Sequence, residues 1–294
     1  MTEHSTDSSA RIADARPCTL GEGVFWHPRR EQLFWFDILG RRLLSQQGDQ
    51  PLEWVFDTRV SAAGWVDDSV LLIASETALF TFDLNSGARQ TVCALEADNP
   101  LTRSNDGRAD PWGGFWIGTM GLNAEAQAGA IYRHYRGELR RLFASISISN
   151  ALCFSPDRRY AYFADTARQQ IWRQPLDERH GWPSGEPQPF INGRVAGLNP
   201  DGAVVDSQGR LWSAQWGASR VACYDSEGRF LQAVAFPATQ VSCPAFGGPG
   251  LSTLFATSAR VGLKDDSLAA EPHAGKLFAT EVAAQGQAEH PVIL

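Results

Sequence analysis

The chain has 294 residues, of which 43% are apolar and 11% aromatic, so it can form two average domains or one large all-β domain with a substantial core. Its formal net charge of −7 argues against nucleic-acid binding, which needs a basic surface, but is compatible with collecting a cation. No run of eighteen apolar residues predicts a transmembrane helix, and the polar N-terminus lacks the apolar core of a signal peptide. We therefore expect a cytoplasmic protein that binds neither nucleic acid nor membrane.

The cysteines and histidines give no sign of a metal centre. The five cysteines are widely spaced and form no CxxC pair, so we interpret them as mostly buried thiols in a reducing compartment. The six histidines are expected in the tail, in turns or in outer strands, which argues against a metal site built from histidine.

Short strands separated by turns dominate the chain in order from the N-terminus. Residues 1–15 are predicted to form a flexible tail, and residues 16–294 a single domain. Within that domain a strongly apolar strand recurs six times, each time after a turn rich in Asp, Gly, Pro or Arg, at 33–36, 70–74, 115–118, 160–163, 211–214 and 254–257. A second strand that alternates apolar with polar residues follows each of these.

A third strand precedes each pair and defines a common register. Six residues before the turn that follows it stand Glu22, Ser61, Asn105, Asn150, Asp201 and Cys243. The intervals between these positions are 39, 44, 45, 51 and 42 residues. A period of roughly 40–50 residues with three or four strands per unit is typical of a β-propeller. We therefore predict an all-β, six-bladed β-propeller whose four-stranded antiparallel blades surround a central channel.

The outer strands are harder to recognise. Candidates are 53–56, 139–143, 188–191 and 231–234. The ring must close because an open sheet edge is a liability. We expect Ala15–Leu20 to add the outer strand of the last blade, with His290–Leu294 as the competing candidate.

The innermost strands begin with polar residues and continue with small or apolar ones, which predicts a chemical site at one end of the channel. Glu22, Asn150 and Asp201 offer two carboxylates and an amide oxygen. Hard oxygen ligands of this kind suit Ca²⁺, Mg²⁺ or Mn²⁺, with Fe²⁺ or Zn²⁺ also possible, and three protein ligands leave positions open for substrate and water. The alternative is that each residue merely forms a turn; their shared register favours the site.

Other residues near this channel mouth are candidates for substrate binding. Arg103 stands two residues before Asn105 and can point into the mouth to bind hydroxyl or carbonyl oxygens, although an Arg on the surface is the alternative. Trp216 is also expected near the mouth, whereas most of the ten tryptophans are expected in the blade core. The chain has no GxSxG or HExxH motif, and Gly21-Glu-Gly23 lacks the third glycine of a dinucleotide site.

Six short stretches together carry a resemblance to a known family. They are Leu20-Gly-Glu-Gly23, Arg103-Ser-Asn-Asp-Gly107, Gly118-Thr-Met120, Ile148-Ser-Asn150, Asn199-Pro-Asp-Gly202 and Cys243-Pro-Ala-Phe-Gly-Gly248. In this order they resemble the gluconolactonase/regucalcin family (SMP-30/gluconolactonase/LRE-like), six-bladed propellers that hydrolyse sugar lactones with a divalent metal. The 199–217 region is more similar to bacterial aldonolactonases than to the animal proteins.

The resemblance implies a role for each candidate residue. By this resemblance, the family's metal ligands match Glu22, Asn150 and Asp201. Its substrate-binding pair matches Arg103 and Asn105, and a substrate-contacting acid of its lid region matches Glu125. Val24 stands where many members have Pro, and Ala151 where many have Gly, so ligand placement or metal preference can differ modestly.

The expected function is hydrolysis of an aldono-1,4- or 1,5-lactone, such as xylono-, arabinono-, galactono- or gluconolactone, with one divalent ion (Ca²⁺, Zn²⁺, Mn²⁺, Mg²⁺ or Fe²⁺). Arg103 and Asn105 would orient the ring, and Asp201 would act as catalytic base, the alternative base being a hydroxide held by the metal. A calcium-binding regulatory protein without significant lactonase activity is the alternative function, and a protein-binding propeller a third. We expect a monomer or a weak homodimer.

Overall fold

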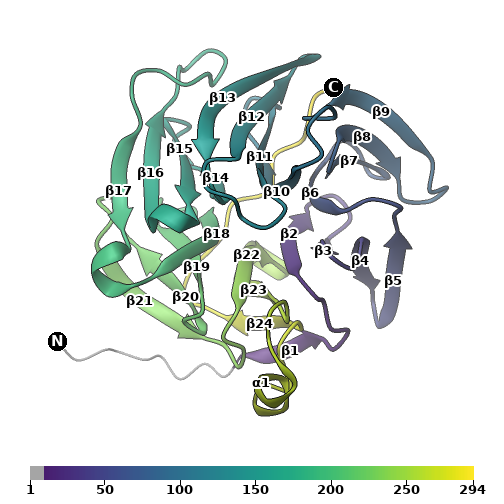
Figure 1. Cartoon of the computed structure of the whole chain (residues 1–294), viewed down its shortest axis with the longest axis vertical. Helices are drawn as coiled ribbons and strands as arrows, with labels where there is room; N and C mark the ends of the chain where they lie inside the picture. The colour runs from purple at the N-terminus through teal and green to yellow at the C-terminus, as the bar shows by residue number, and fades with distance from the viewer. Residues whose placement is uncertain (1–9) are drawn as a thin grey trace.

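Six four-stranded antiparallel sheets surround a central channel in the computed structural model of the chain, which describes residues 10–294 (Figure 1). This arrangement confirms the predicted six-bladed β-propeller. Among the described residues, no helix is both long enough and apolar enough to cross a bilayer.

Each blade runs from an innermost strand at the channel to an outermost strand at the rim. In that order the blades are β2 (Gly21–His27), β3 (Gln32–Asp37), β4 (Arg42–Gln47) and β5 (Gln50–Val55); β6 (Val60–Trp65), β7 (Val70–Ser75), β8 (Ala78–Asp83) and β9 (Arg89–Ala94); β10 (Thr102–Ala109), β11 (Phe115–Gly121), β12 (Gly129–Tyr135) and β13 (Glu138–Ile146); β14 (Ser149–Phe154), β15 (Tyr160–Asp165), β16 (Gln170–Pro175) and β17 (Gln188–Asn192); β18 (Asn199–Val205), β19 (Leu211–Trp216), β20 (Arg220–Tyr224) and β21 (Phe230–Ala235); and β22 (Val241–Gly247), β23 (Thr253–Ser258), β24 (Leu277–Glu281) and β1 (Arg11–Asp14). The helical segments are short: α1 (Asp265–Ala270) and the 3-10 turns η1 (Thr166–Arg168), η2 (Arg194–Ala196) and η3 (Pro249–Leu251).

The second strands of the blades form most of the core, as their continuous apolar runs predict. Trp35, Trp116 and Trp212 are fully buried in β3, β11 and β19. Two of these indoles donate to a buried carboxylate six residues earlier: Trp116 Nε1 to Asp110 Oδ2 at 3.2 Å and Trp212 Nε1 to Asp206 Oδ2 at 2.9 Å. The aspartate in the turn therefore fixes the tryptophan that fills the blade.

The ring is closed from the N-terminal side, but by an earlier segment than predicted. β1 pairs antiparallel with β24, with Arg11 opposite Ala279 and Ile12 opposite Phe278. The strand thus lies at Arg11–Asp14 and not at Ala15–Leu20, and it begins inside the segment 1–15 that we predicted as a tail. Residues 1–9 of that segment lie outside the described part of the chain.

The C-terminal segment takes a different path from the predicted alternative of an outer strand. Residues 286–293, called here the C-terminal strap, cross the far end of the channel, as the yellow trace in Figure 1 shows. Gln287 Nε2 donates to the carbonyl oxygens of Phe154 (3.2 Å) and Val205 (2.9 Å), at the ends of two inner strands. Val292 N donates to Trp65 O at 2.8 Å. The far end is therefore covered, and the mouth is the end at which the inner strands begin.

Two histidines do not lie where we predicted. His27 is the last residue of the innermost strand β2, and His134 lies within β12, the third strand of its blade. Neither lines the cavity at the mouth. All five cysteines are free thiols, four of them buried and Cys93 half-buried, as predicted.

Candidate functional site at the channel mouth

A break in pairing near the start of each innermost strand redirects side chains toward the channel. The register with the second strand shifts between Glu22 and Phe25, Val60 and Ala62, Ser104 and Gly107, Asn150 and Cys153, Pro200 and Ala203, and Val241 and Pro244. Such bulges bend a strand locally and change the direction of its side chains. The predicted site positions therefore coincide with the bulges of their strands.

Two of the bulges contain a residue in the left-handed region of backbone conformation. Gly23, directly after Glu22, has φ of +56°, and Ala151, directly after Asn150, has φ of +58°. Glycine adopts this conformation freely, whereas alanine is strained there. The departure from glycine at position 151 therefore places a strained residue beside a candidate ligand.

A cavity of about 350 Å³ opens at the mouth and brings together five of the six predicted site residues. Its polar lining consists of Glu22, Arg103, Asn105, Asn123, Asn150, Thr166 and Asp201. Its apolar lining consists of Leu20, Leu39, Met120, Leu122, Ala124, Ile148, Trp216 and Val261. The volume suits a small organic molecule, and Trp216 lies at the mouth as predicted.

A continuous chain of hydrogen bonds orients the amide and guanidinium groups of this cavity. Arg103 Nη1 donates to Asn105 Oδ1 at 2.7 Å, and Asn105 Nδ2 donates to Asn150 Oδ1 at 3.1 Å. Asn150 Nδ2 donates to Thr166 Oγ1 at 2.8 Å, and Thr166 Oγ1 donates to Pro200 O at 2.6 Å. Thr166 therefore connects the inner strand that carries Asn150 with the residue before Asp201. Sequence analysis missed Thr166 because it lies in η1, after a second strand and outside the inner-strand register.

The two carboxylates of the cavity are buried close to each other. Burial, and after it the nearby charge of Asp106, raises the pKa of Glu22 to about 8. Burial, then Glu22 and then Asp106, raises the pKa of Asp201 well above its ordinary value. Within residues 10–294, neither Glu22 nor Asp201 forms a salt bridge. Two mutually repelling buried carboxylates are relieved by a bound cation.

The donor set fits a hard divalent cation only if an amide oxygen takes part. The described residues contain no cluster of three or more His, Cys, Asp or Glu side chains suited to a metal. Two buried carboxylates and the side-chain oxygen of Asn150 supply the oxygen ligands that Ca²⁺, Mg²⁺ and Mn²⁺ accept. The residues present therefore fit a divalent cation held by Glu22, Asn150 and Asp201.

Arg103 is buried beside this acidic pair. Burial lowers the pKa of Arg103 to about 10, while the charge of Glu22 acts in the opposite direction. Its Nη1 donates to Ser104 O (2.9 Å) as well as to Asn105. The guanidinium is thus held by its own strand and aimed into the cavity, which excludes the alternative of a surface Arg.

Three residues singled out by sequence lie outside the cavity lining. Glu125, in the β11–β12 connection, is exposed and accepts hydrogen bonds from Asn123 N (3.0 Å) and Nδ2 (2.9 Å). Asn123 itself lines the cavity. Ser61 and Cys243 share the inner-strand register but are buried outside the cavity lining. Ser61 donates a hydrogen bond to Ser104 Oγ at 2.8 Å.

The fold and this site define a class: six-bladed propellers with an oxygen-rich candidate cation site and an adjacent polar clamp at the channel mouth. The profile of the SMP-30/gluconolactonase/LRE-like family matches residues 20–260. The chain belongs to that family, as its sequence motifs indicate.

Individual relatives are similar along nearly the whole chain. An L-arabinolactonase of Azospirillum brasilense is 38% identical over 292 residues, covering 97% of this chain and 95% of the relative. A 6-deoxy-6-sulfogluconolactonase of Pseudomonas putida is 33% identical over 279 residues, covering 93% and 95%. The crystal structure of a calcium-binding protein, regucalcin, from Agrobacterium tumefaciens superposes with a TM-score of 0.95 at 39% identity, covering 98% of each chain.

Proposed function

We propose that this chain is a sugar lactonase that opens an aldonolactone to the aldonic acid with one divalent cation. One observation carries the proposal: the Arg103–Asn105 pair and the set Glu22, Asn150 and Asp201 line a single cavity. Relatives named as lactonases along nearly their whole length support the class of enzyme, a hydrolase of carboxylic ester bonds. The cavity volume of about 350 Å³ suits one five- or six-carbon lactone.

The cation, held by Glu22, Asn150 and Asp201, would polarise the lactone carbonyl and stabilise negative charge on its oxygen. The buried Arg103 guanidinium and Asn105 amide bind ring hydroxyls, and the apolar rim around them limits the access of bulk water. Asp201 accepts the proton of the attacking water and returns it to the ring oxygen as the bond between that oxygen and the carbonyl carbon breaks.

Glu125 acts on substrate binding indirectly, by holding Asn123. Its two hydrogen bonds to Asn123 place that side chain at the rim of the cavity, where a substrate hydroxyl would lie. Glu125→Gln is expected to raise KM with little change in kcat, because the change loosens a substrate contact and leaves the carboxylates of the cavity intact.

The alternative function is a calcium-binding regulatory protein, and the name of the Agrobacterium relative is the observation that favours it. A protein that only buffers calcium has no use for a guanidinium–amide clamp beside its cation. Arg103 and Asn105 therefore favour the enzyme.

The test is lactone opening followed with a pH indicator, on metal-stripped protein supplied in turn with Ca²⁺, Mg²⁺, Mn²⁺, Zn²⁺ or Fe²⁺. Xylono-, arabinono-, galactono- and gluconolactone are compared with an enzyme-free control for spontaneous hydrolysis. Metal-dependent turnover that is lost in Asp201→Asn and shows a raised KM in Arg103→Lys is expected. Folded, metal-bound protein that accelerates none of the lactones would refute the enzyme and leave the regulatory protein.

The assembly and compartment belong to the proposal as well. We propose a cytoplasmic monomer or weak homodimer that binds no nucleic acid or membrane. Light scattering across a range of protein concentrations tests the assembly.

A further inference from the structure

A buried carboxylate that the proposed reaction does not use lies next to the substrate clamp. Asp106 follows Asn105 in the bulge of β10 and is 4% exposed. Its Oδ1 accepts the hydrogen bond of Gly107 N at 2.9 Å, and its Oδ2 accepts that of Leu152 N at 2.8 Å. The second bond crosses from β10 to β14, the neighbouring blade. Asp106 therefore does not form the turn that its Asn-Asp-Gly context suggests.

Leu152 lies in the same β14 bulge as Asn150, two residues later in the chain. Only Ala151, with φ of +58°, separates the two residues. An alanine keeps this strained conformation only when surrounding contacts hold it there. Asp106 holds the peptide on the N–H side of Leu152, and Arg108 Nε donates to the Leu152 carbonyl oxygen at 3.3 Å. Both polar groups of the Leu152 backbone thus end on β10.

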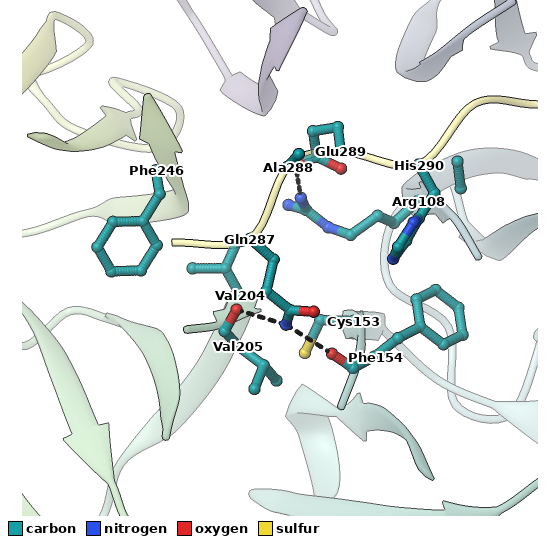
Figure 2. Close-up of a pocket in the computed structure, with 11 residues that line it drawn as sticks. Arg108, Cys153, Phe154, Val204, Val205, Phe246, Gln287, Ala288, Glu289 and His290 are labelled. Atoms are coloured by element: carbon teal, nitrogen blue, oxygen red, sulfur yellow. Dashed lines mark hydrogen bonds and ion pairs between the residues drawn. The ribbon is translucent and has the colours of Figure 1, made fainter. Parts of the chain in front are cut away.

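The C-terminal strap supports this arrangement from the far end of the channel. Figure 2 shows Arg108 extended toward the strap, where its Nη1 forms an ion pair with Glu289. Gln287, two residues earlier, bridges the Phe154 and Val205 carbonyl oxygens in the same view. The strap therefore fixes Arg108, and Arg108 fixes Leu152.

We propose that Asp106 is a positioning residue for the cation site. Asp106 holds the Leu152 amide and thereby the bulge that presents Asn150. Arg108, held by Glu289, supports the same bulge from the far end of the channel. The inference rests on the proposed function in one respect, the assignment of Asn150 as a ligand. The hydrogen bond from Leu152 N to Asp106 does not require a charge on Asp106, and this bond sets the path of β14 after Asn150.

Two substitutions separate positioning from charge. Asp106→Ala removes the acceptor and the charge together, whereas Asp106→Asn removes the charge but keeps one carbonyl oxygen that can accept from Leu152 N. The affinity for Mn²⁺ is measured by calorimetry on metal-stripped protein. Residues that orient metal ligands typically contribute ten- to a hundredfold to affinity, so we expect a loss of about that size in Asp106→Ala and a clearly smaller loss in Asp106→Asn.

Asp110→Asn is the matched control. Asp110 is also a buried acceptor and directly follows the last residue of β10, but it accepts from Gly114 N (2.9 Å) and Arg133 Nε (2.6 Å), away from the mouth. We expect it to lower the melting temperature without changing Mn²⁺ affinity. Glu289→Gln is expected to weaken Mn²⁺ binding less than Asp106→Ala, and an unchanged affinity would remove the strap from the proposal.

Hydrogen exchange of the Leu152 amide provides a readout that needs neither metal nor activity. Faster exchange in metal-free Asp106→Ala than in wild type and Asp106→Asn would support the positioning role. Equal losses of Mn²⁺ affinity in Asp106→Ala and Asp106→Asn would show that charge alone matters, and no loss in either would show no role; both results overturn the inference. Wild-type protein that binds Mn²⁺ but opens no lactone refutes the proposed function and leaves this inference standing.

Discussion

Thr166→Val is the substitution that tests most directly how the mouth is organised. The Thr166 hydroxyl accepts from Asn150 Nδ2 at 2.8 Å and donates to Pro200 O at 2.6 Å, so it ties two candidate ligand strands together. Valine has nearly the same shape and removes only the hydroxyl. The change therefore tests the two hydrogen bonds with little disturbance of packing.

The expected magnitude follows from the two bonds. At about 1 kcal/mol each, their loss lowers the free energy of unfolding by about 2 kcal/mol. An unfolding entropy of about 2.1 cal/mol/K per residue amounts to about 0.6 kcal/mol/K for 294 residues, so the melting temperature falls by about 3 °C. The bond that orients Asn150 is one of the two, and its 1 kcal/mol corresponds to an about fivefold weaker cation affinity.

The assay combines thermal unfolding of metal-stripped protein with calorimetric titration of Mn²⁺. Thr166→Ser, which keeps the hydroxyl, is the matched control and is expected to retain wild-type cation affinity. Wild-type Mn²⁺ affinity in Thr166→Val would refute the reasoning that this hydroxyl orients Asn150. A drop in melting temperature without a change in affinity would assign Thr166 to stability alone.

Three further predictions follow from burial and backbone conformation. Mn²⁺ affinity is expected to rise by about tenfold or more per pH unit from pH 6 to about 8, because burial and Asp106 raise the pKa of Glu22 to about 8, burial also raises the pKa of Asp201, and only the carboxylates bind the ion; flat calorimetric affinity over this range would contradict it. Ala151→Gly is expected to change the free energy of unfolding by less than about 1 kcal/mol, because relief of backbone strain at φ of +58° offsets the lost methyl group and the added entropy of the unfolded chain. Ala203→Gly on β18 is the control, since Ala203 is as buried as Ala151, and it is expected to lower stability. Equal losses of stability in denaturant titrations would show that position 151 is not strained. His134 is buried, both its ring nitrogens lack a hydrogen-bond partner among the described residues, and burial lowers its pKa. The unfolded chain therefore binds the proton more readily, and stability falls as pH drops below about 6.5. His134→Leu should flatten this dependence of stability on pH in urea titrations at pH 5 to 7.

The propeller could be predicted because its signal is periodic and is carried by side-chain burial. Runs such as Leu33–Phe36 are apolar on both faces since both faces pack against neighbouring blades, and they recur at nearly constant spacing. The closing strand Arg11–Asp14 has no such run, because this outermost strand is largely exposed and only its last residue, Asp14, is buried. Its position therefore could not be read from the apolar pattern, and the prediction placed it too late in the chain.

The site residues divide in the same way. Glu22, Asn150 and Asp201 could be found because they share a position in the repeat, and the cavity includes all three. Thr166 could not, since it reaches Asn150 and Pro200 through side-chain contacts 16 and 34 residues distant in sequence. Asp106 was hidden by the bulge between Ser104 and Gly107, which interrupts the alternation of faces on which sequence interpretation of a strand depends.

The closure of the last blade by β1 determines the order in which the molecule can be assembled. β1 is synthesised before its partner β24 (Leu277–Glu281), which follows about 265 residues later, so β1 stays unpaired while the six inner strands are made. Contacts between such distant segments make ring closure a slow, late step of folding. The strap from Gly286 onward is made later still, and its contacts with Trp65, Phe154 and Val205 reach three different blades. The strap can therefore form these contacts only after the three blades have folded.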